Sequence, residues 1–206
     1  MSYGKADPHS SSVKPHLAIR NPSKWIIRFA PLVREGGPVL DLAAGGGRHG
    51  RYFLERGHPV TLVDRQTEAL LDLVTDQRAT VIQADLEDGS SWPLNEKYAG
   101  VVVVNYLHRP LTENLLESLE PGGLLIYETF ARGNENFSRP RNPDHLLKSG
   151  ELLQMVLGRL QVIAYEHGIR EKCPLSGVIQ RICAVNNLDQ SVREDREPQV
   201  LNLEPD

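Results

Sequence analysis

The chain has 206 residues, a formal net charge of −4 at pH 7 and two cysteines, Cys173 and Cys183. A chain of this length predicts one domain that buries roughly 70% of its unfolded surface, so stability requires neither a metal nor a disulfide. No apolar run approaches the roughly 20 residues of a membrane span, and the first residues lack the apolar core of a secretory signal, so we expect a soluble, cytoplasmic protein.

The two ends of the chain are predicted to be flexible segments, 1–15 and 189–206, around one domain that spans 16–188. The last 18 residues hold six acidic residues and two arginines, and the remainder is balanced with 21 basic and 21 acidic residues. Segments with little apolar bulk stay solvated. No basic face of the kind used in general nucleic-acid binding is expected.

The first predicted element is a helix with Ser23 as its N-cap, limited in length by Pro31. Five short and nearly continuous apolar runs follow, separated by helix-like segments. Strands buried on both faces have this pattern, and the alternation predicts a parallel sheet with helices on both sides. The predicted strands are VLDLA (39–43), HPVTLVD (58–64), TVIQAD (80–85), GVVVVNYL (100–107) and GLLIYETF (123–130).

Helices are predicted at 48–57 with Gly57 as the C-cap, from Thr67 in TEALLDLV, and from Thr112 to the Pro-Gly-Gly at 121–123. Residues 86–97 are too broken for a full crossover helix and are expected to form a loop or a single turn.

The end of the domain is predicted to be partly helical at 142–158 and then to form two strands, 160–169 and 177–185. The short connection between these two strands favours an antiparallel pair. The fold class is therefore α/β: a doubly wound, mostly parallel, seven-stranded sheet with a C-terminal antiparallel strand pair.

A glycine loop follows the first predicted strand. Gly45, Gly47 and Gly50 fit G-x-G-x-x-G between a strand and a helix, and Asp64 closes the next strand 19 residues later. This spacing suits a nicotinamide dinucleotide, whose pyrophosphate binds the helix N-terminus. It also suits S-adenosylmethionine, which has no phosphate.

Two further carboxylates favour S-adenosylmethionine over the dinucleotide. Asp41 lies four residues before Gly45, where it would disfavour a pyrophosphate but attract a ligand that carries an ammonium and a sulfonium. Asp85 ends the third strand, so acidic residues from three strands are expected at the carboxyl edge of the sheet, where doubly wound folds bind their ligands.

Five motifs resemble, in order and spacing, those of class I S-adenosylmethionine-dependent methyltransferases over residues 38–130. They are VLDLAAGGGRHG, VTLVD, QADLED, GVVVVNYLHR and LEPGGLLIYETF. The final strand pair is similar to the closing antiparallel hairpin of that Rossmann-like fold, and small bacterial methyltransferases of the tellurite-resistance or thiopurine type are the nearest kind. One departure is Ala43, which replaces the usual first glycine of the loop.

The resemblance implies a set of cofactor-binding residues at the ends of the first four strands. Asp64 and Asp85 have an alternative role, which is to cap the turns that follow them. The implied positions are Asp41, Ala43, Gly45 and Gly47 around the methionyl end, Asp64 on the ribose hydroxyls, Arg65 and Leu86 against the adenine, Asp85 on its amino group, and Asn105 beside the methyl.

The candidate catalytic residues follow the fourth strand and are Asn105, Tyr106 and His108. His108 has an ordinary pKa suited to a general base. The alternatives are that His108 and Arg109 hydrogen-bond nearby loops and that Tyr106 packs. The family's amino-methylating branch has a different signature here, so methylation of DNA bases or of glutamine amides loses support.

The candidate acceptor-binding residues lie mainly in the long polar segment 128–145. Arg132, Arg139 and Arg141, with Arg109, are predicted to bind an anionic acceptor by forked hydrogen bonds, or else to belong to a solvated loop. Glu128 ends its strand at the same edge and is expected to orient the acceptor. No metal site is predicted.

Three functions are compatible with these patterns. The preferred one is an S-adenosylmethionine-dependent methyltransferase with a small-molecule acceptor. The second is a nicotinamide-dependent oxidoreductase, although the chain lacks a Tyr-x-x-x-Lys pair. The third is a scaffold protein that binds the cofactor without turnover. No sequence feature indicates an oligomeric state.

Overall fold

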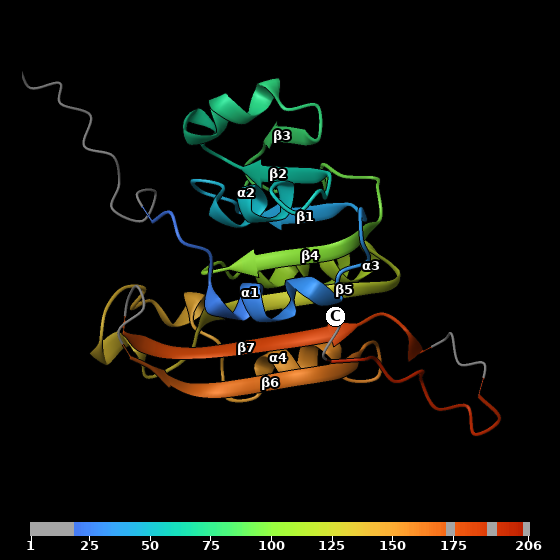
Figure 1. The fold of residues 1–206 in the computed structure, drawn as a ribbon. Helices are drawn as coiled ribbons and strands as arrows, with labels where there is room; N and C mark the ends of the chain where they lie inside the picture. Colours follow the sequence, from blue (N-terminus) through green and yellow to red (C-terminus); the bar gives the residue numbers. More distant parts are fainter. Residues whose placement is uncertain (1–18, 172–175, 189–192, 204–206) are drawn as a thin grey trace, which may run out of the picture.

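The computed structural model describes residues 19–171, 176–188 and 193–203, and its centre is one seven-stranded sheet with the strand order β3-β2-β1-β4-β5-β7-β6 (Figure 1). The neighbouring pairs from β3 to β5 are parallel, and β7 lies antiparallel between β5 and β6. The predicted fold class is therefore confirmed. The strands are β1 (Val39–Leu42), β2 (Val60–Asp64), β3 (Ala79–Gln83), β4 (Tyr98–Val104), β5 (Leu119–Phe130), β6 (Gln161–Arg170) and β7 (Gly177–Val185).

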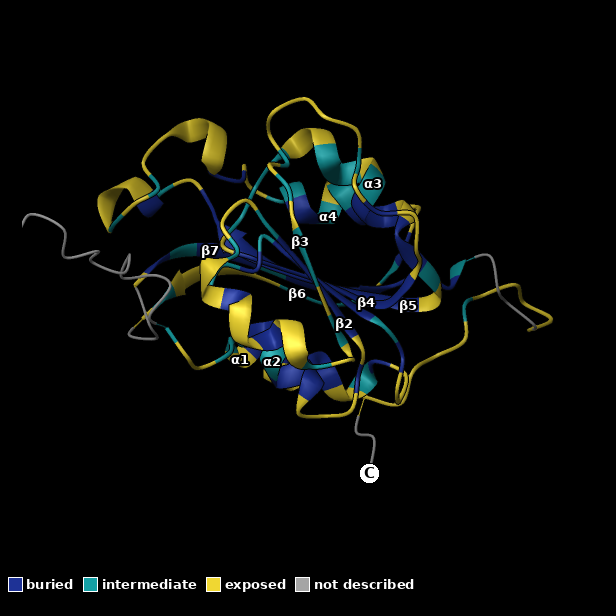
Figure 2. Ribbon diagram, turned by 90° about the horizontal axis from the view of Figure 1, so that it is seen from above, coloured by how far each residue is buried: buried dark blue, intermediate teal, exposed yellow. Residues whose placement is uncertain are grey.

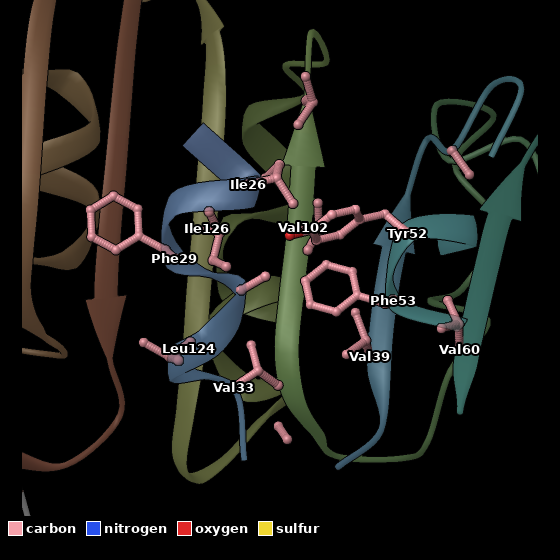
Figure 3. Close-up of a cluster of buried hydrophobic side chains, with 14 of the residues drawn as sticks. Ile26, Phe29, Val33, Val39, Tyr52, Phe53, Val60, Val102, Leu124 and Ile126 are labelled. Carbon is pink, nitrogen blue, oxygen red and sulfur yellow. The ribbon is translucent and has the colours of Figure 1, made fainter. Parts of the chain in front are cut away.

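Helices cover both faces of the sheet (Figure 2). One face carries α1 (Lys24–Phe29) and α2 (Arg48–Leu54), and the other carries α3 (Thr112–Glu117) and α4 (Glu151–Val156). The side chains of α1 and α2, including Ile26 and Phe53, meet Val102 and Ile126 of the sheet in one apolar cluster (Figure 3). The face under α1 and α2 is called the α1 face below.

Helix α1 begins and ends as predicted. The Ser23 hydroxyl accepts a hydrogen bond from the Trp25 backbone N–H at 3.1 Å, which satisfies one open donor of the first turn. The Trp25 indole donates to the Ile182 carbonyl of β7 at 3.1 Å and fixes the helix on the sheet. After Phe29 the chain continues as the 3₁₀ turn η2 (Ala30–Leu32), which contains Pro31.

Two of the predicted helices differ from the structure. Residues Glu68–Thr75 form a 3₁₀ helix, η3, in which only Leu70 and Leu73 are buried. Buried residues spaced by three match the three residues per turn of a 3₁₀ helix. Helix α3 ends at Glu117 because the following residues already belong to β5: Tyr98 pairs with Leu119 in the sheet.

The helix predicted at 48–57, α2, also ends early, at Leu54, and Gly57 lies in the following turn with φ 86°. The remaining 3₁₀ turns are η4 (Arg109–Leu111), η5 (Asn134–Asn136) and η6 (Pro143–His145).

The predicted flexible segment 1–15 lies outside the described residues, as do Cys173 and the rest of 172–175 between β6 and β7. Within the tail, residues 193–203 contain no helix or strand. The Gln199 carbonyl accepts from the Asn187 amide at 3.1 Å, so this part of the tail contacts the domain. No helix in the described ranges is long and apolar enough to cross a membrane.

Candidate functional site

The glycine loop between β1 and α2 contains three residues in the left-handed region. Ala43, Gly45 and Gly47 have φ angles of 53°, 57° and 70°. An added Cβ at Gly47 would lie 2.6 Å from Cδ2 of Leu70, and one at Gly50 would lie 2.6 Å from Cδ2 of Leu62. A side chain at either position would therefore force Leu70 or Leu62 to move, and Ala43 holds a conformation that favours glycine.

Asp41 does not face the open edge of the sheet. Its side chain is 1% exposed, and its carboxylate accepts from the Gly50 backbone N–H at 2.8 Å. Burial is the main cause that raises the pKa of Asp41 to about 7. The carboxyl group thus joins β1 to α2 beneath the glycine loop, and its predicted contact with the methionyl group would have to be indirect.

His49, which no sequence pattern singled out, is the buried neighbour of Asp41. Its Nδ1 lies 3.9 Å from Oδ1 of Asp41, and its Nε2 has no hydrogen-bond partner among the described residues. Burial lowers the pKa of His49 to about 3, with a smaller effect of the Arg48 charge. The sequence signal was its position two residues after a loop glycine, on the helix face that must pack on the sheet.

These two groups make opposite contributions to the pH dependence of stability. The raised pKa of Asp41 contributes stability below about pH 4 that is lost as the pH rises to about 7. The lowered pKa of His49 contributes stability above about pH 6.5 that is lost as the pH falls to about 3. Between about pH 4 and 6.5 the two slopes oppose each other.

We expect Asp41→Asn to remove the pH dependence of stability that comes from Asp41 and to leave the one that comes from His49. The Asn oxygen can still accept from Gly50, so the variant should be more stable than the parent at pH 8, by up to about 4 kcal/mol, since one pKa unit corresponds to about 1.4 kcal/mol. Its stability should then fall steadily from pH 6.5 to 4.5. Urea unfolding at each pH measures this, and His49→Asn should give the opposite slope. A parent-like pH profile for Asp41→Asn would contradict the assignment.

Asp64 and Asp85 lie at the carboxyl edge of the sheet, and both also cap turns. Asp64 accepts from the Gly45 N–H at 2.7 Å and from the Gln66 N–H at 2.9 Å, so it links the tip of β2 to the glycine loop. Asp85 accepts from the Glu87 N–H at 3.0 Å. Each carboxylate oxygen can accept a second hydrogen bond, so both residues can still accept a hydrogen bond from a ligand.

A cavity of about 300 Å³ lies beyond the end of β3 and is lined by Asp85, Leu86 and Trp92. Arg65 is exposed nearby and accepts through its carbonyl from the Gln83 side chain. This arrangement of a carboxylate beside apolar side chains matches the composition expected of an adenine site.

Tyr106 is half-buried and lies close enough to Glu87 and Asp85 for their charges to affect its pKa. Its hydroxyl is buried and has no hydrogen-bond partner among the described residues. Burial, and then the charges of Glu87 and Asp85, raise its pKa. The high pKa makes Tyr106 a poor base at neutral pH, which favours the packing alternative.

Asn105 and His108 follow β4 but occupy different environments. Asn105 is exposed with φ 57°, and its N–H donates to the Glu128 carbonyl at 2.9 Å. His108 lines a cavity of about 210 Å³ together with Tyr127 and Met155, on the face covered by α3 and α4. The two residues therefore do not line one cavity.

Arg109 is held by the protein itself. Its guanidinium pairs with Glu151 at 2.6 Å and donates to the carbonyls of Asp144 and Leu146 at 2.6 and 3.0 Å. The contact with Glu151 raises the pKa of Arg109. These bonds fix the loop before α4, in agreement with the alternative that Arg109 has a structural role.

The long segment after β5 is ordered by a buried amide. The Asn134 side chain donates to the carbonyls of Pro140 at 3.0 Å and Ser138 at 3.4 Å. Arg132, Arg139 and Arg141 are exposed on the surface of this loop.

Glu128 is a buried carboxylate at the carboxyl end of β5. It is 1% exposed and accepts from the Ser23 hydroxyl at 3.2 Å, from Arg170 at 2.7 Å and from Arg181 at 3.5 Å. The Arg181 guanidinium also lies 4.7 Å from the centroid of the Trp25 ring. This network connects α1 to β5, β6 and β7.

Ser23, Arg170 and Arg181 were not among the predicted site residues. The only indication in the sequence was Glu128, because a carboxylate within an apolar strand requires cationic partners.

The largest of the three cavities, about 530 Å³, borders this network. It lies on the α1 face at the carboxyl edge and is lined by residues 19–24, by Arg48 at the start of α2, and by parts of β5, β6 and β7. In the described part of the chain no group of three His, Cys, Asp or Glu residues is placed to hold a metal ion.

Comparisons with known proteins give matches at the level of structure. No protein-family model and no curated protein matches the sequence. The structure of TehB from Haemophilus influenzae superposes with a TM-score of 0.64 at 17% identity and covers 78% of this chain. The match spans 61% of the TehB chain, which is less than two thirds of its length.

Two further solved structures are similar over most of the domain. The 1,6-didemethyltoxoflavin-N1-methyltransferase of Burkholderia thailandensis, solved with S-adenosylhomocysteine, has a TM-score of 0.57 at 22% identity and covers 79% of this chain and 76% of its own. The N-methyltransferase NodS of Bradyrhizobium japonicum WM9 has a TM-score of 0.58 at 14% identity, with 78% and 93% covered. The chain therefore has the Rossmann-like fold of the class I S-adenosylmethionine-dependent methyltransferases.

Proposed function

We propose that the protein is an S-adenosylmethionine-dependent methyltransferase that acts on a small-molecule acceptor. The observation that carries the proposal is the carboxyl edge of β1, β2 and β3. There the left-handed glycine loop is tied to Asp64, beside a cavity that contains Asp85 and Leu86. The structural neighbours support it, since one of them was solved with S-adenosylhomocysteine.

The residues at this edge fit a nucleoside with a positive sulfur. The glycine positions leave the loop backbone bare, and an added Cβ at Gly47 would meet Leu70. Asp64 would take the ribose hydroxyls, and Asp85 would accept from the adenine amino group, with Leu86 against the ring. Gly45 and Gly47 would lie by the methionyl end, and Asn105 by the methyl.

The cofactor supplies a methyl group that is already activated by a positively charged sulfur. With the cofactor bound, the acceptor atom would supply the electron pair for its new bond to the methyl carbon, the sulfur would keep the pair of the bond that breaks, and any proton on the acceptor atom would be released. The chain's main task is to align the acceptor and exclude water, and proximity can supply roughly 7 to 11 kcal/mol of the barrier.

A general base is needed only for acceptors that lose a proton before or during the attack. His108 is the predicted candidate for that role, but it lines the cavity on the face covered by α3 and α4, apart from Asn105. The proposal places the protein in the cytoplasm, in keeping with its two cysteines, of which Cys183 is a buried free thiol.

The other two functions differ from this one in measurable ways. An oxidoreductase would bind NADH through a pyrophosphate at the loop, and the buried Asp41 lies just behind the loop, beside Gly50. A scaffold protein would bind the cofactor but transfer no methyl group.

We expect 1 mM S-adenosylhomocysteine to raise the Tm, and NADH to leave it unchanged. Asp85→Ala should weaken S-adenosylhomocysteine binding by about 10- to 100-fold, since a hydrogen bond to a charged group contributes about 1.5 to 3 kcal/mol. Titration calorimetry measures the affinity, and Asp76→Ala is the matched control, a partly exposed acid that caps a turn away from the edge. Stabilisation by NADH alone would overturn the proposal in favour of the oxidoreductase.

A further inference from the structure

The cavity on the α1 face borders the residue that follows the glycine loop, and it is separate from the cavity with Asp85 and Leu86 described above. Arg48, which lines it, is the first residue of α2 and directly follows Gly47. Its volume of about 530 Å³ is in the range of small-molecule sites. A ligand in this cavity would lie next to the methionyl end of a cofactor on the loop.

The lining of this cavity carries a positive formal charge. Five basic residues line it, with three glutamates, which gives a formal charge of +2 with histidine neutral. The basic residues are Arg20, Lys24, Arg48, Arg170 and Arg181.

Two of the three glutamates are neutralised within the protein. Glu128 pairs with Arg170 at 2.7 Å and with Arg181 at 3.5 Å. Glu166 also pairs with Arg181, through Nε at 2.8 Å, and with Arg28 at 3.4 Å. Neither carboxylate therefore needs a cationic ligand.

Arg20 lies before α1, and Lys24 is the first residue of α1. The Arg20 charge helps to lower the pKa of Asp72. Arg20 and Lys24 are exposed and form no ion pair with any residue in the described ranges. Arg48 donates to the Asn21 carbonyl at 3.1 Å, at the rim of the same segment. A cationic acceptor would be repelled here, and an anionic one attracted.

The rest of the wall is apolar. Ile19 and Pro22 contribute from the segment before α1, and Ile169 and Ile179 contribute from β6 and β7. Such a wall binds the apolar body of a ligand, while a few charged groups set its orientation.

We propose that this cavity binds the methyl acceptor, and that the acceptor is a small molecule with an apolar body and a carboxylate or phosphate group. Arg20 and Lys24 bind the anionic group, with Arg48 beside them. This inference rests on the proposed methyltransferase function. It names a different anion-binding set from Arg132, Arg139 and Arg141, none of which lines the three cavities described above.

The charge of the acceptor can be measured before the acceptor is identified. A small-molecule extract of the source organism is separated on anion and cation exchangers, and each fraction is incubated with the full chain and methyl-labelled S-adenosylmethionine. Labelled product is expected from the fraction that the anion exchanger retains. Product formed only from the unretained or cation-exchange fractions would overturn the anionic acceptor.

The double variant Arg20→Gln/Lys24→Gln tests the cavity. It should need about 100-fold or more of the active fraction for half-maximal transfer, with an unchanged maximal rate, because two charge-assisted contacts, each contributing about 10-fold or more, are lost. Arg159→Gln, which removes an exposed charge paired with Glu113, should behave as the parent. An unchanged requirement in the double variant would overturn the placement of the acceptor.

Binding of S-adenosylhomocysteine separates the two proposals. The affinity of the double variant for S-adenosylhomocysteine should equal that of the parent, and a loss of its binding would assign the two residues to the cofactor and overturn the inference. Failure of the parent chain to bind S-adenosylhomocysteine would overturn the proposed function itself. Binding without transfer to any fraction would contradict the small-molecule acceptor on which both rest.

Discussion

Glu128→Ala is expected to lower the free energy of unfolding by about 3 to 5 kcal/mol, the usual cost of removing one partner from a buried ion pair. The change leaves the Arg170 guanidinium, with a side chain 13% exposed, without its carboxylate. It also removes the acceptor of the Ser23 hydroxyl that caps α1. Arg181 keeps Glu166 as a partner, so the loss should lie near the lower limit.

Two variants separate the charge from the hydrogen bonds. Glu128→Gln keeps an oxygen for Ser23 or Arg170 and should cost less than Glu128→Ala. Glu113→Ala removes one partner of an exposed pair, whose side chains are 44% and 65% accessible, and should cost less than about 1 kcal/mol. Urea unfolding at pH 7 gives the three values, and equal losses for Glu128→Ala and Glu113→Ala would show that the buried network contributes no net stability.

Strand register explains why this network could not be predicted from the sequence. Arg181 pairs with Glu128 on one side and with Glu166 on the other in the sheet. Glu128 is 53 residues from Arg181 in the chain and Glu166 is 15 residues from it, and the three charges meet because β7 lies between β5 and β6. Residues directly opposite in neighbouring strands interact, but their pairing requires the strand order, which the apolar runs do not specify.

The parallel sheet itself was predictable, because buried strands such as Val101–Val104 form uninterrupted apolar runs. The helical segments were less so. Thr67 was predicted as a helix N-cap, but its side chain makes no capping hydrogen bond. The form of η3 is set by the packing of Leu70 and Leu73. Tertiary contacts decided the type of helix there, and local propensity did not.

The candidate site was predicted at the level of strand ends, where Asp64 and Asp85 lie at the expected edge. Asp41, unlike Asp64 and Asp85, does not lie at the open edge, because side chains alternate between the two faces along a strand. Val39 and Asp41 point to the face that α2 covers, so the acid accepts from Gly50 beneath the loop. His108 lies by a separate cavity under α3 and α4, since the chain turns into η4 immediately after it.

Gly47→Ala is expected to lower the free energy of unfolding by about 3 kcal/mol and to abolish measurable binding of S-adenosylhomocysteine at micromolar ligand. A left-handed φ of 70° costs a residue with a Cβ about 1 to 2 kcal/mol. The new Cβ would also lie 2.6 Å from Cδ2 of the fully buried Leu70 and 3.2 Å from Cδ2 of Leu62. Such overpacking typically costs about 1 to 3 kcal/mol.

Gly57→Ala is the matched control, because Gly57 has φ 86° and nothing lies within 4 Å of an added Cβ. It should show the backbone cost alone, and the excess in Gly47→Ala is the cost of the contact with Leu70. A double-mutant cycle with Leu70→Ala isolates that contact. If the clash is real, Gly47→Ala should cost less in the Leu70→Ala background, since the shortened side chain makes room for the methyl group. Additive losses would assign the whole effect to the backbone, and the glycine would then serve the shape of the loop rather than its packing on η3.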